Sequence, residues 1–225
     1  MCSAPRHSAT LAAGSARATR PFASRSAARG FFALASFAAA VGLSAGLAGC
    51  EPERPPPPTL HAVPDFQAQD QAGRAFSLAQ LDGQVWVANF VFTDCPSVCP
   101  MLTAQMSNFQ RRMAPQAPGL RYVSISVDPA QDTPPVLAAY AARHDADLRT
   151  WRFLTLGDHQ ATVDLLMRGF RVRMGEREEQ SAGGYDIMHA SHFVLVDGER
   201  HVRGYYSTDA EGLANLEADA LALLR

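Results

Sequence analysis

Two cysteines separated by three residues, Cys95 and Cys99, are the residues of this 225-residue chain most suited to chemistry. They lie in the stretch FTDCPSVCPM, residues 92–101. On a helix, residues four apart have Cα atoms roughly 6 Å apart, a separation that a disulfide tolerates. Two thiolates converging on one point also suit Cu(I) or Zn²⁺, with a third ligand from elsewhere. We therefore expect a disulfide or a metal site rather than two small buried apolar side chains.

The elements on either side of these cysteines are predicted from their apolar patterns. Residues 85–92 (VWVANFVF) are nearly all apolar, as in a strand that is buried on both faces of a sheet. After the cysteines, apolar residues recur at helical spacing over residues 101–113. A helix capped by Ser97 places Cys99 in its positive first turn, where a thiolate is favoured.

The rest of the chain predicts an α/β fold of the thioredoxin-like kind, a central mixed sheet flanked by helices, with an N-terminal β-hairpin. A charged stretch between Met174 and Tyr185 is expected to be a solvent-exposed loop. The other predicted elements are a hairpin over 65–77 with Gly73 at its turn, a strand over 120–127, a helix from Pro134 capped by Asp132 or Thr133 with Val136, Leu137 and Tyr140 on its apolar face, a strand over 151–156, a helix over 161–170 capped by Asp158, a hairpin over 193–206 and a closing helix over 209–224.

In such a fold the segment entering the last hairpin lies beside the cysteines, and here it is YDIMHASH, residues 185–192. Its two histidines, His189 and His192, are candidates for the third metal ligand, because a neutral imidazole binds copper well. An alternating strand sends residues three apart to opposite faces. We therefore favour His189 over His192.

Several other residues near the cysteines have competing interpretations. Asp94 has no assigned role. Asp128, at a strand end before a proline, either orients a ligand or belongs to a turn. Met101, Met106 and Met188 have soft sulfurs that suit copper passage, but their helical or strand spacing favours packing in the core.

The N-terminal residues are interpreted as an export signal followed by a spacer. Residues 1–49 contain five Arg, no Asp or Glu, and an apolar run that ends in LAGC at Cys50. This ending resembles the lipobox of bacterial lipoproteins, which are cut before the cysteine and acylated on it. The alternative is an uncleaved membrane anchor. Residues 50–63 are then a lipidated Cys and a Pro-rich linker that holds one domain, residues 64–225, off the periplasmic face of a bacterial membrane.

Removal of the signal leaves 15 Arg against 22 Asp and Glu, a net charge of −7. This charge argues against nucleic acid as a partner. It also leaves Cys95 and Cys99 as the free thiols of the domain in an oxidising compartment.

Three ordered motifs resemble the Sco/SenC family of thioredoxin-fold copper proteins, which serve the assembly of the binuclear copper site of cytochrome c oxidase. They are FTDCPSVCP at 92–100, SVDP and DTP at 126–134, and HAS before FVLVD at 189–197. The resemblance implies that Cys95, Cys99 and His189 bind copper, as Cu(I) or Cu(II). It also implies the copper subunit of the oxidase as partner, with other copper chaperones or thiol reductants as further ones.

Two functions follow from these residues, and whether the chain is an enzyme stays open between them. The first is a copper chaperone that delivers copper to cytochrome c oxidase. The second is a thiol-disulfide oxidoreductase whose redox pair, Cys95 and Cys99, reduces partner cysteines before metal loading. The three-residue spacing and the absence of a proline from HASH argue against a general thioredoxin. A peroxidase is disfavoured because no proton-donor constellation surrounds Cys95.

Overall fold

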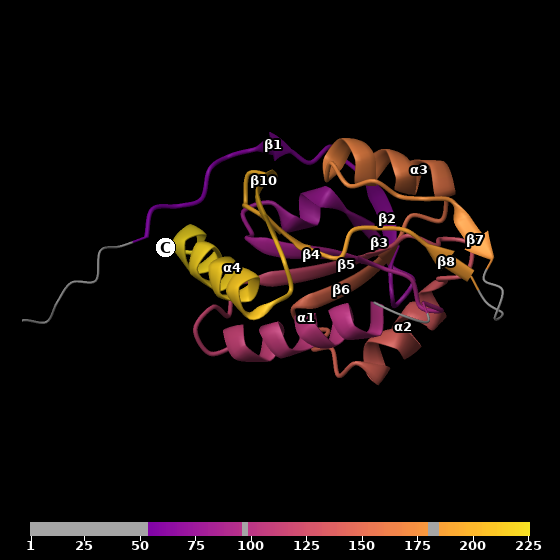
Figure 1. Ribbon diagram of the computed structural model, residues 1–225, viewed down its shortest axis with the longest axis horizontal. Helices are drawn as coiled ribbons and strands as arrows, with labels where there is room; N and C mark the ends of the chain where they lie inside the picture. Colours follow the sequence, from indigo (N-terminus) through magenta and orange to yellow (C-terminus); the bar gives the residue numbers. More distant parts are fainter. Residues whose placement is uncertain (1–53, 96–98, 180–184) are drawn as a thin grey trace, which may run out of the picture. The chain divides into compact units, whose positions relative to one another are not determined.

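The computed structural model describes residues 54–95, 99–179 and 185–225 (Figure 1). The predicted signal, the predicted acylation site Cys50 and the predicted cap Ser97 lie outside these ranges. No helix in the described ranges is both long enough and apolar enough to cross a membrane. The elements are β1 His61–Ala62, β2 Gln67–Asp70, β3 Ala75–Ser77, η1 Leu78–Leu81, β4 Trp86–Val91, α1 Cys99–Met113, β5 Arg121–Ser126, α2 Pro134–Arg143, β6 Trp151–Thr155, α3 His159–Asp164, η2 Leu165–Gly169, β7 Arg177–Glu179, β8 Tyr185–Ile187, β9 Phe193–Val196, β10 His201–Tyr206 and α4 Ala210–Leu223.

Eight of the strands form one mixed sheet in the order β1-β10-β9-β4-β5-β6-β2-β3. The centre of the sheet is parallel, because β5 pairs with both β4 and β6 in that sense. The predicted N-terminal hairpin is present as β2 and β3, and Gly73 takes the positive φ of 74° that its turn requires. Strands β9 and β10 form the predicted second hairpin.

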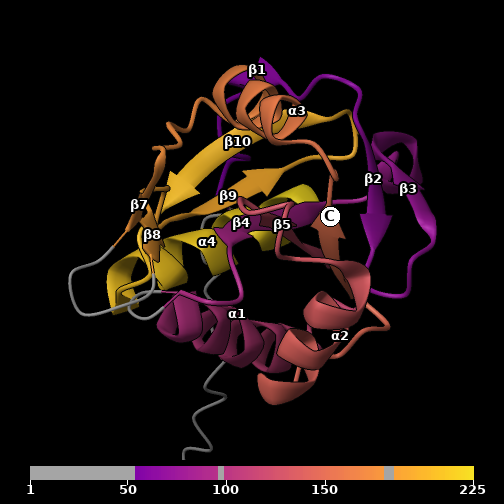
Figure 2. The same cartoon turned by 90° about the vertical axis from the view of Figure 1, so that its right-hand side faces the viewer.

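Strand β4 is buried along its whole length because helices cover both faces of the sheet (Figure 2). Trp86, Ala88 and Phe90 contribute to a core that contains Phe170, at the end of η2. Val87 belongs to the core on the other face, beneath α1, α2 and α4. Strand β4 is apolar at nearly every position because its side chains pack into two separate cores, one on each face of the sheet.

The stretch predicted as a solvent-exposed loop is instead partly a second small sheet, in which β7 pairs with β8. Arg177 and Glu179 are exposed, as their charges suggest, but Tyr185 is buried. The Arg177 guanidinium lies 3.5 Å from the centre of the Tyr185 ring, a cation–π contact that fastens the two strands.

Two details of helix α2 also differ from the prediction. Thr133 occupies the N-cap position, but no side chain caps the helix, and Asp132 binds elsewhere. Leu137 and Tyr140 are buried as predicted, whereas Val136 is 37% exposed. The predicted cap Asp158 of α3 accepts a hydrogen bond from the backbone of its helix. Asp209, which was predicted as the first residue of the closing helix, instead caps α4 and accepts a hydrogen bond from the Gly212 N–H.

Part of the predicted linker is built into the domain. Strand β1 pairs with β10, and the Pro57 and Pro58 carbonyl oxygens accept hydrogen bonds from Arg203. Arg54 forms an ion pair with Asp219 of α4 at 2.9 Å. The folded chain therefore begins before Pro64, at least as early as Arg54.

Candidate metal centre

Both cysteines of the motif are buried thiols that follow the carboxyl end of β4. Cys95 is 7% exposed, and its backbone N–H donates to the Phe92 carbonyl. Cys99 is fully buried and begins α1; its backbone N–H donates to the Cys95 Sγ at 3.4 Å. The first helical N–H is thus directed at the sulfur of Cys95.

Burial, rather than the positive end of the helix, has the larger effect on the pKa of the Cys99 thiol. Its removal from water raises the pKa of Cys99, and a hydrogen bond with the Cys95 side chain adds to this effect. The sequence predicted that the positive helix end would favour a Cys99 thiolate, and in the metal-free protein that prediction is wrong. Cys99 is a neutral thiol at neutral pH.

His189 meets Cys99 across the fold. Its Nε2 lies 3.2 Å from the Cys99 Sγ, and its Nδ1 lies 3.0 Å from the Ala190 carbonyl oxygen. Burial lowers the pKa of His189, so the ring is neutral at pH 7. A neutral ring that donates its Nδ1 hydrogen to Ala190 has its Nε2 lone pair free to bind a metal.

His192 points to different neighbours. Its ring lies 5.3 Å from that of Tyr205 in an edge-on contact. Its Nε2 is buried and has no hydrogen-bond partner among the described residues. The structure therefore brings His189, and not His192, against a cysteine of the motif.

The metal site is only partly assembled. No group of three His, Cys, Asp or Glu side chains among the described residues is already arranged to hold a metal ion. Cys99 and His189 are in contact, and the Cys95 sulfur is held against the backbone of Cys99. The donor set of two sulfurs and one imidazole nitrogen fits a soft metal such as copper, but binding requires these side chains to adjust.

A buried carboxylate that the sequence assigned to a helix cap holds the loop before the cysteines. Asp132 accepts hydrogen bonds from the Thr93 backbone at 3.1 Å, the Thr93 hydroxyl at 2.6 Å and the Ser126 hydroxyl at 2.6 Å. Burial raises the pKa of Asp132, although these hydrogen bonds oppose the shift. Thr93 lies two residues before Cys95, so Asp132 fixes the path of the chain into the motif.

Asp128 proves to be a structural acceptor. It is buried, and its Oδ2 accepts a hydrogen bond from the Tyr185 hydroxyl at 2.6 Å. The Tyr185 ring stacks on Phe92 at 5.6 Å, and Phe92 contacts the His189 ring edge-on at 5.9 Å. Asp128 and Tyr185 thereby join β8, which leads to His189, to the end of β5. The SVDP motif identified Asp128 as a residue of interest, but only the structure shows that its hydrogen-bond donor is Tyr185.

The methionines divide between core and surface. Met106 is fully buried, as predicted. Met101 is 55% exposed and Met188 is 69% exposed, so the prediction of core packing is wrong for these two. Met188 is exposed, whereas the next residue, His189, contacts Cys99.

Comparison with known proteins agrees with the motifs. A model of the SCO1/SenC family matches residues 55–220. A SCO1 protein homolog from Bacillus subtilis (strain 168) is 32% identical over 185 residues, which cover 79% of this chain and 91% of the relative.

Solved structures of relatives have the same thioredoxin-like fold. A SCO1/SenC family lipoprotein from Bacillus anthracis superimposes with a TM-score of 0.66 at 28% identity, over 73% of this chain and 95% of that one. Copper-bound ScoI from Bradyrhizobium japonicum superimposes with a TM-score of 0.63 at 26% identity, over 73% of this chain and 100% of that one. The predicted fold class is confirmed.

Proposed function

The chain belongs to the SCO1/SenC family, and from this premise we propose that it binds copper through Cys95, Cys99 and His189 and delivers it to the binuclear copper site of cytochrome c oxidase. One observation supports the binding most directly: the His189 Nε2 lies 3.2 Å from the Cys99 Sγ, although 90 positions separate the two residues. The ScoI relative from Bradyrhizobium japonicum has a structure with copper bound, which independently supports copper as the metal.

The protonation states of Cys99 and His189 suit a site that binds copper and later releases it. Cys99 is held as a neutral thiol by burial, and His189 is held as a neutral imidazole. Copper binding therefore displaces thiol protons, and release of copper restores them. Met101 and Met188 are exposed and lie next to these ligands in the sequence, so we expect a partner protein to approach the site from their side.

A second candidate function is thiol-disulfide exchange with a partner protein. The Cys99 backbone N–H contacts the Cys95 Sγ at 3.4 Å, so the two thiols are close in space as well as in sequence. In this reaction the thiol pair loses two electrons and two protons and becomes a disulfide, while a disulfide of the partner becomes two thiols. Only the reduced pair supplies thiolates for copper, so the two functions exclude each other at any one moment.

The localisation that fits this function is the periplasmic face of a bacterial membrane, with Cys50 acylated as the anchor. The LAGC sequence supports the acylation, and the Bacillus anthracis relative is described as a lipoprotein. A membrane-bound partner such as the copper subunit of the oxidase would then share the same surface.

The ligand assignment is tested by titrating the reduced protein with Cu(I) and Cu(II). We expect one copper per chain in the parent. His189→Ala should weaken Cu(II) binding by about tenfold or more and change the sulfur-to-copper absorption, because Cu(II) favours an additional nitrogen donor. His192→Ala is the matched control and should bind both ions like the parent.

Oxidation of Cys95 and Cys99 to a disulfide should abolish copper uptake, because only thiolates are competent ligands. Equal uptake by oxidised and reduced protein would exclude the cysteines as the site. Parent-like Cu(II) binding by His189→Ala would exclude the histidine. His189→Ala should also still cycle between dithiol and disulfide, which separates the two candidate functions.

A further inference from the structure

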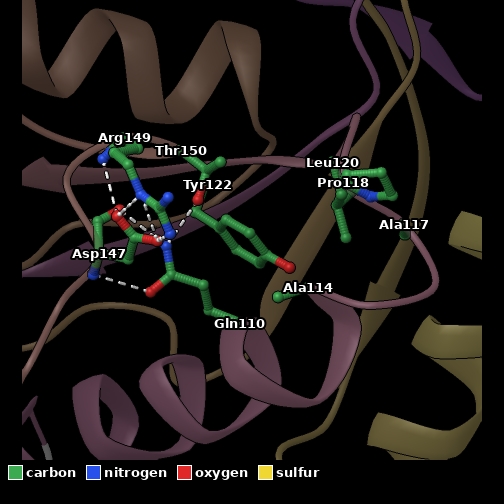
Figure 3. A pocket seen from close by; sticks show the side chains of 9 residues that line it. All are labelled: Gln110, Ala114, Ala117, Pro118, Leu120, Tyr122, Asp147, Arg149 and Thr150. Carbon is green, nitrogen blue, oxygen red and sulfur yellow. Dashed lines mark hydrogen bonds and ion pairs between the residues drawn. The ribbon is translucent and has the colours of Figure 1, made fainter.

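Two adjoining hollows lie at the end of the sheet opposite the metal centre. Cys95 follows the carboxyl end of β4, whereas the hollows lie where β5 and β6 begin. The first hollow has a volume of about 320 Å³ and is lined by Ala114, Ala117, Pro118 and Leu120, among others (Figure 3). The second, of about 170 Å³, is lined by Arg121, Arg149 and Arg152. Tyr122, Arg149 and Thr150 line both hollows, so the two hollows adjoin each other.

The arginine hollow carries positive charge that nearby carboxylates do not balance. Arg149 pairs with Asp147 at 2.7 Å. Arg121 donates to the Pro118 and Leu120 carbonyls, and Arg152 to the Leu148 and Trp151 carbonyls. In the part of the chain that the structure describes, neither of these two guanidiniums pairs with a carboxylate. This local positive charge contrasts with the net charge of −7 that the chain carries after residue 49.

The first hollow, which we call the apolar hollow, has an apolar side and a polar side. Tyr122 lines the hollow and is 2% exposed, and Figure 3 shows its hydroxyl beside Ala114. Ala114, Ala117, Pro118 and Leu120 form its apolar side, whereas Gln110, Asp147, Arg149 and Thr150 form the side toward the arginine hollow. A largely apolar recess beside a cluster of guanidiniums is complementary to an amphiphile with an anionic headgroup.

The start of the described chain lies at this same end. Arg54 pairs with Asp219 on α4, close to Glu217, which bonds with Arg112 and Gln116 at the end of α1. Figure 1 shows the chain start and the end of α4 together, far from β7 and β8. Cys50 is four residues before Arg54, and four residues span at most about 14 Å. A lipid on Cys50 would therefore hold this end, and not the metal centre, against the bilayer.

We propose that Arg121, Arg149 and Arg152 bind the phosphate of an anionic phospholipid, with the apolar hollow receiving the adjoining part of the lipid. The proposal rests on the membrane anchoring proposed above. Headgroup binding fixes the orientation of the tethered domain, so that Cys99 and His189 face away from the bilayer. A free anion would satisfy the arginines alone, but it would leave the apolar hollow and the position of the tether unexplained.

The test uses the full chain in non-ionic detergent micelles, titrated by calorimetry with dihexanoyl phosphatidylglycerol, dihexanoyl phosphatidylcholine and inorganic phosphate. We expect phosphatidylglycerol to bind best. The double variant Arg121→Gln/Arg152→Gln should weaken that binding by about tenfold or more, because charge-assisted hydrogen bonds to phosphate are lost. The control Arg143→Gln/Arg173→Gln changes the charge equally but lies outside both hollows, and should bind like the parent.

Three outcomes would overturn the proposal: equal binding of phosphatidylcholine, inorganic phosphate binding as tightly as the lipid, or equal losses in the two double variants. The titration does not need acylation, so Cys50→Ser should bind phosphatidylglycerol like the parent. Copper titration of the same samples should be unchanged in both double variants. Failure of the headgroup site is therefore distinguishable from failure of the anchor or of the copper site.

Discussion

For the single residue Cys99, two effects act in opposite directions. The first turn of a helix favours a thiolate, whereas burial favours the neutral thiol. Because Cys99 has no exposed surface, burial dominates and raises its pKa. The sequence gives the position of a residue on a helix but not the depth at which that helix end lies, so this result could not be predicted from the motif.

Copper affinity should therefore increase with pH. A thiol whose pKa is raised is protonated throughout the neutral range, and binding must displace that proton. Each displaced proton makes the apparent affinity rise by up to about tenfold per pH unit. Competition with a Cu(I) chelator at pH 6, 7 and 8 measures the slope. An apparent affinity that is flat over this range would show that Cys99 is already a thiolate in the metal-free protein.

Removing the Asp132 carboxylate should disturb the cysteine motif as well as the stability of the fold. Asp132→Ala leaves the Thr93 N–H and two hydroxyls without their acceptor, and each unsatisfied buried group costs about 1–3 kcal/mol. We expect a loss of free energy of unfolding of at least about 2 kcal/mol, seen in urea melts, together with weaker copper binding.

Asp209→Ala is the control for this variant because Asp209 caps α4, away from the motif. It should cost about 1 kcal/mol and leave copper affinity unchanged. If Asp132→Ala lowers stability but binds copper like the parent, the carboxylate supports the fold without positioning the motif.

For the secondary-structure elements, the sequence predicted the strands and helices that carry strong periodicity and missed short strands that do not. Strands β4, β5 and β6 and helix α1 lie where their apolar patterns placed them. Strands β7 and β8 were missed because exposed residues such as Glu178 dominate the composition of that stretch. Their position depends on Tyr185, whose hydroxyl bonds with Asp128 and whose ring contacts Arg177. Such long-range contacts leave no local pattern in the sequence.

The β7 and β8 pair should control how firmly His189 is held. Tyr185→Phe removes the hydrogen bond to Asp128 and leaves a buried carboxylate without that donor. We expect faster amide hydrogen exchange in residues 185–189 and weaker Cu(II) binding, because His189 follows β8 after one residue. Tyr205→Phe, which loses a 2.8 Å bond to the Phe170 carbonyl, is the matched control. Unchanged exchange in Tyr185→Phe would show that the ring contacts alone hold the strand.

For the whole molecule, the sequence predicted a signal, a linker and a domain that starts at Pro64, but the described chain makes contacts with the domain from Arg54 onward. The proline run indicated a spacer, and residues 54–63 are nevertheless bound to the domain through Asp219, Arg203 and β10. A two-residue strand and bonds to proline carbonyls have no periodicity, so composition could not reveal them. If Cys50 is acylated as proposed, the tether is short, because only residues 51–53 separate Cys50 from Arg54.

Replacement of the proposed acylation site tests this arrangement. Cys50→Ser should abolish lipid attachment, and the domain should stay folded because Arg54 and the residues after it hold their contacts without the lipid. The parent should remain in the membrane fraction after a carbonate wash, and the variant should be released from it. Copper titration of the released protein should match the parent, since Cys99 and His189 lie at the opposite end of the sheet. Retention of Cys50→Ser in washed membranes would instead show that residues 31–48 act as an uncleaved membrane anchor.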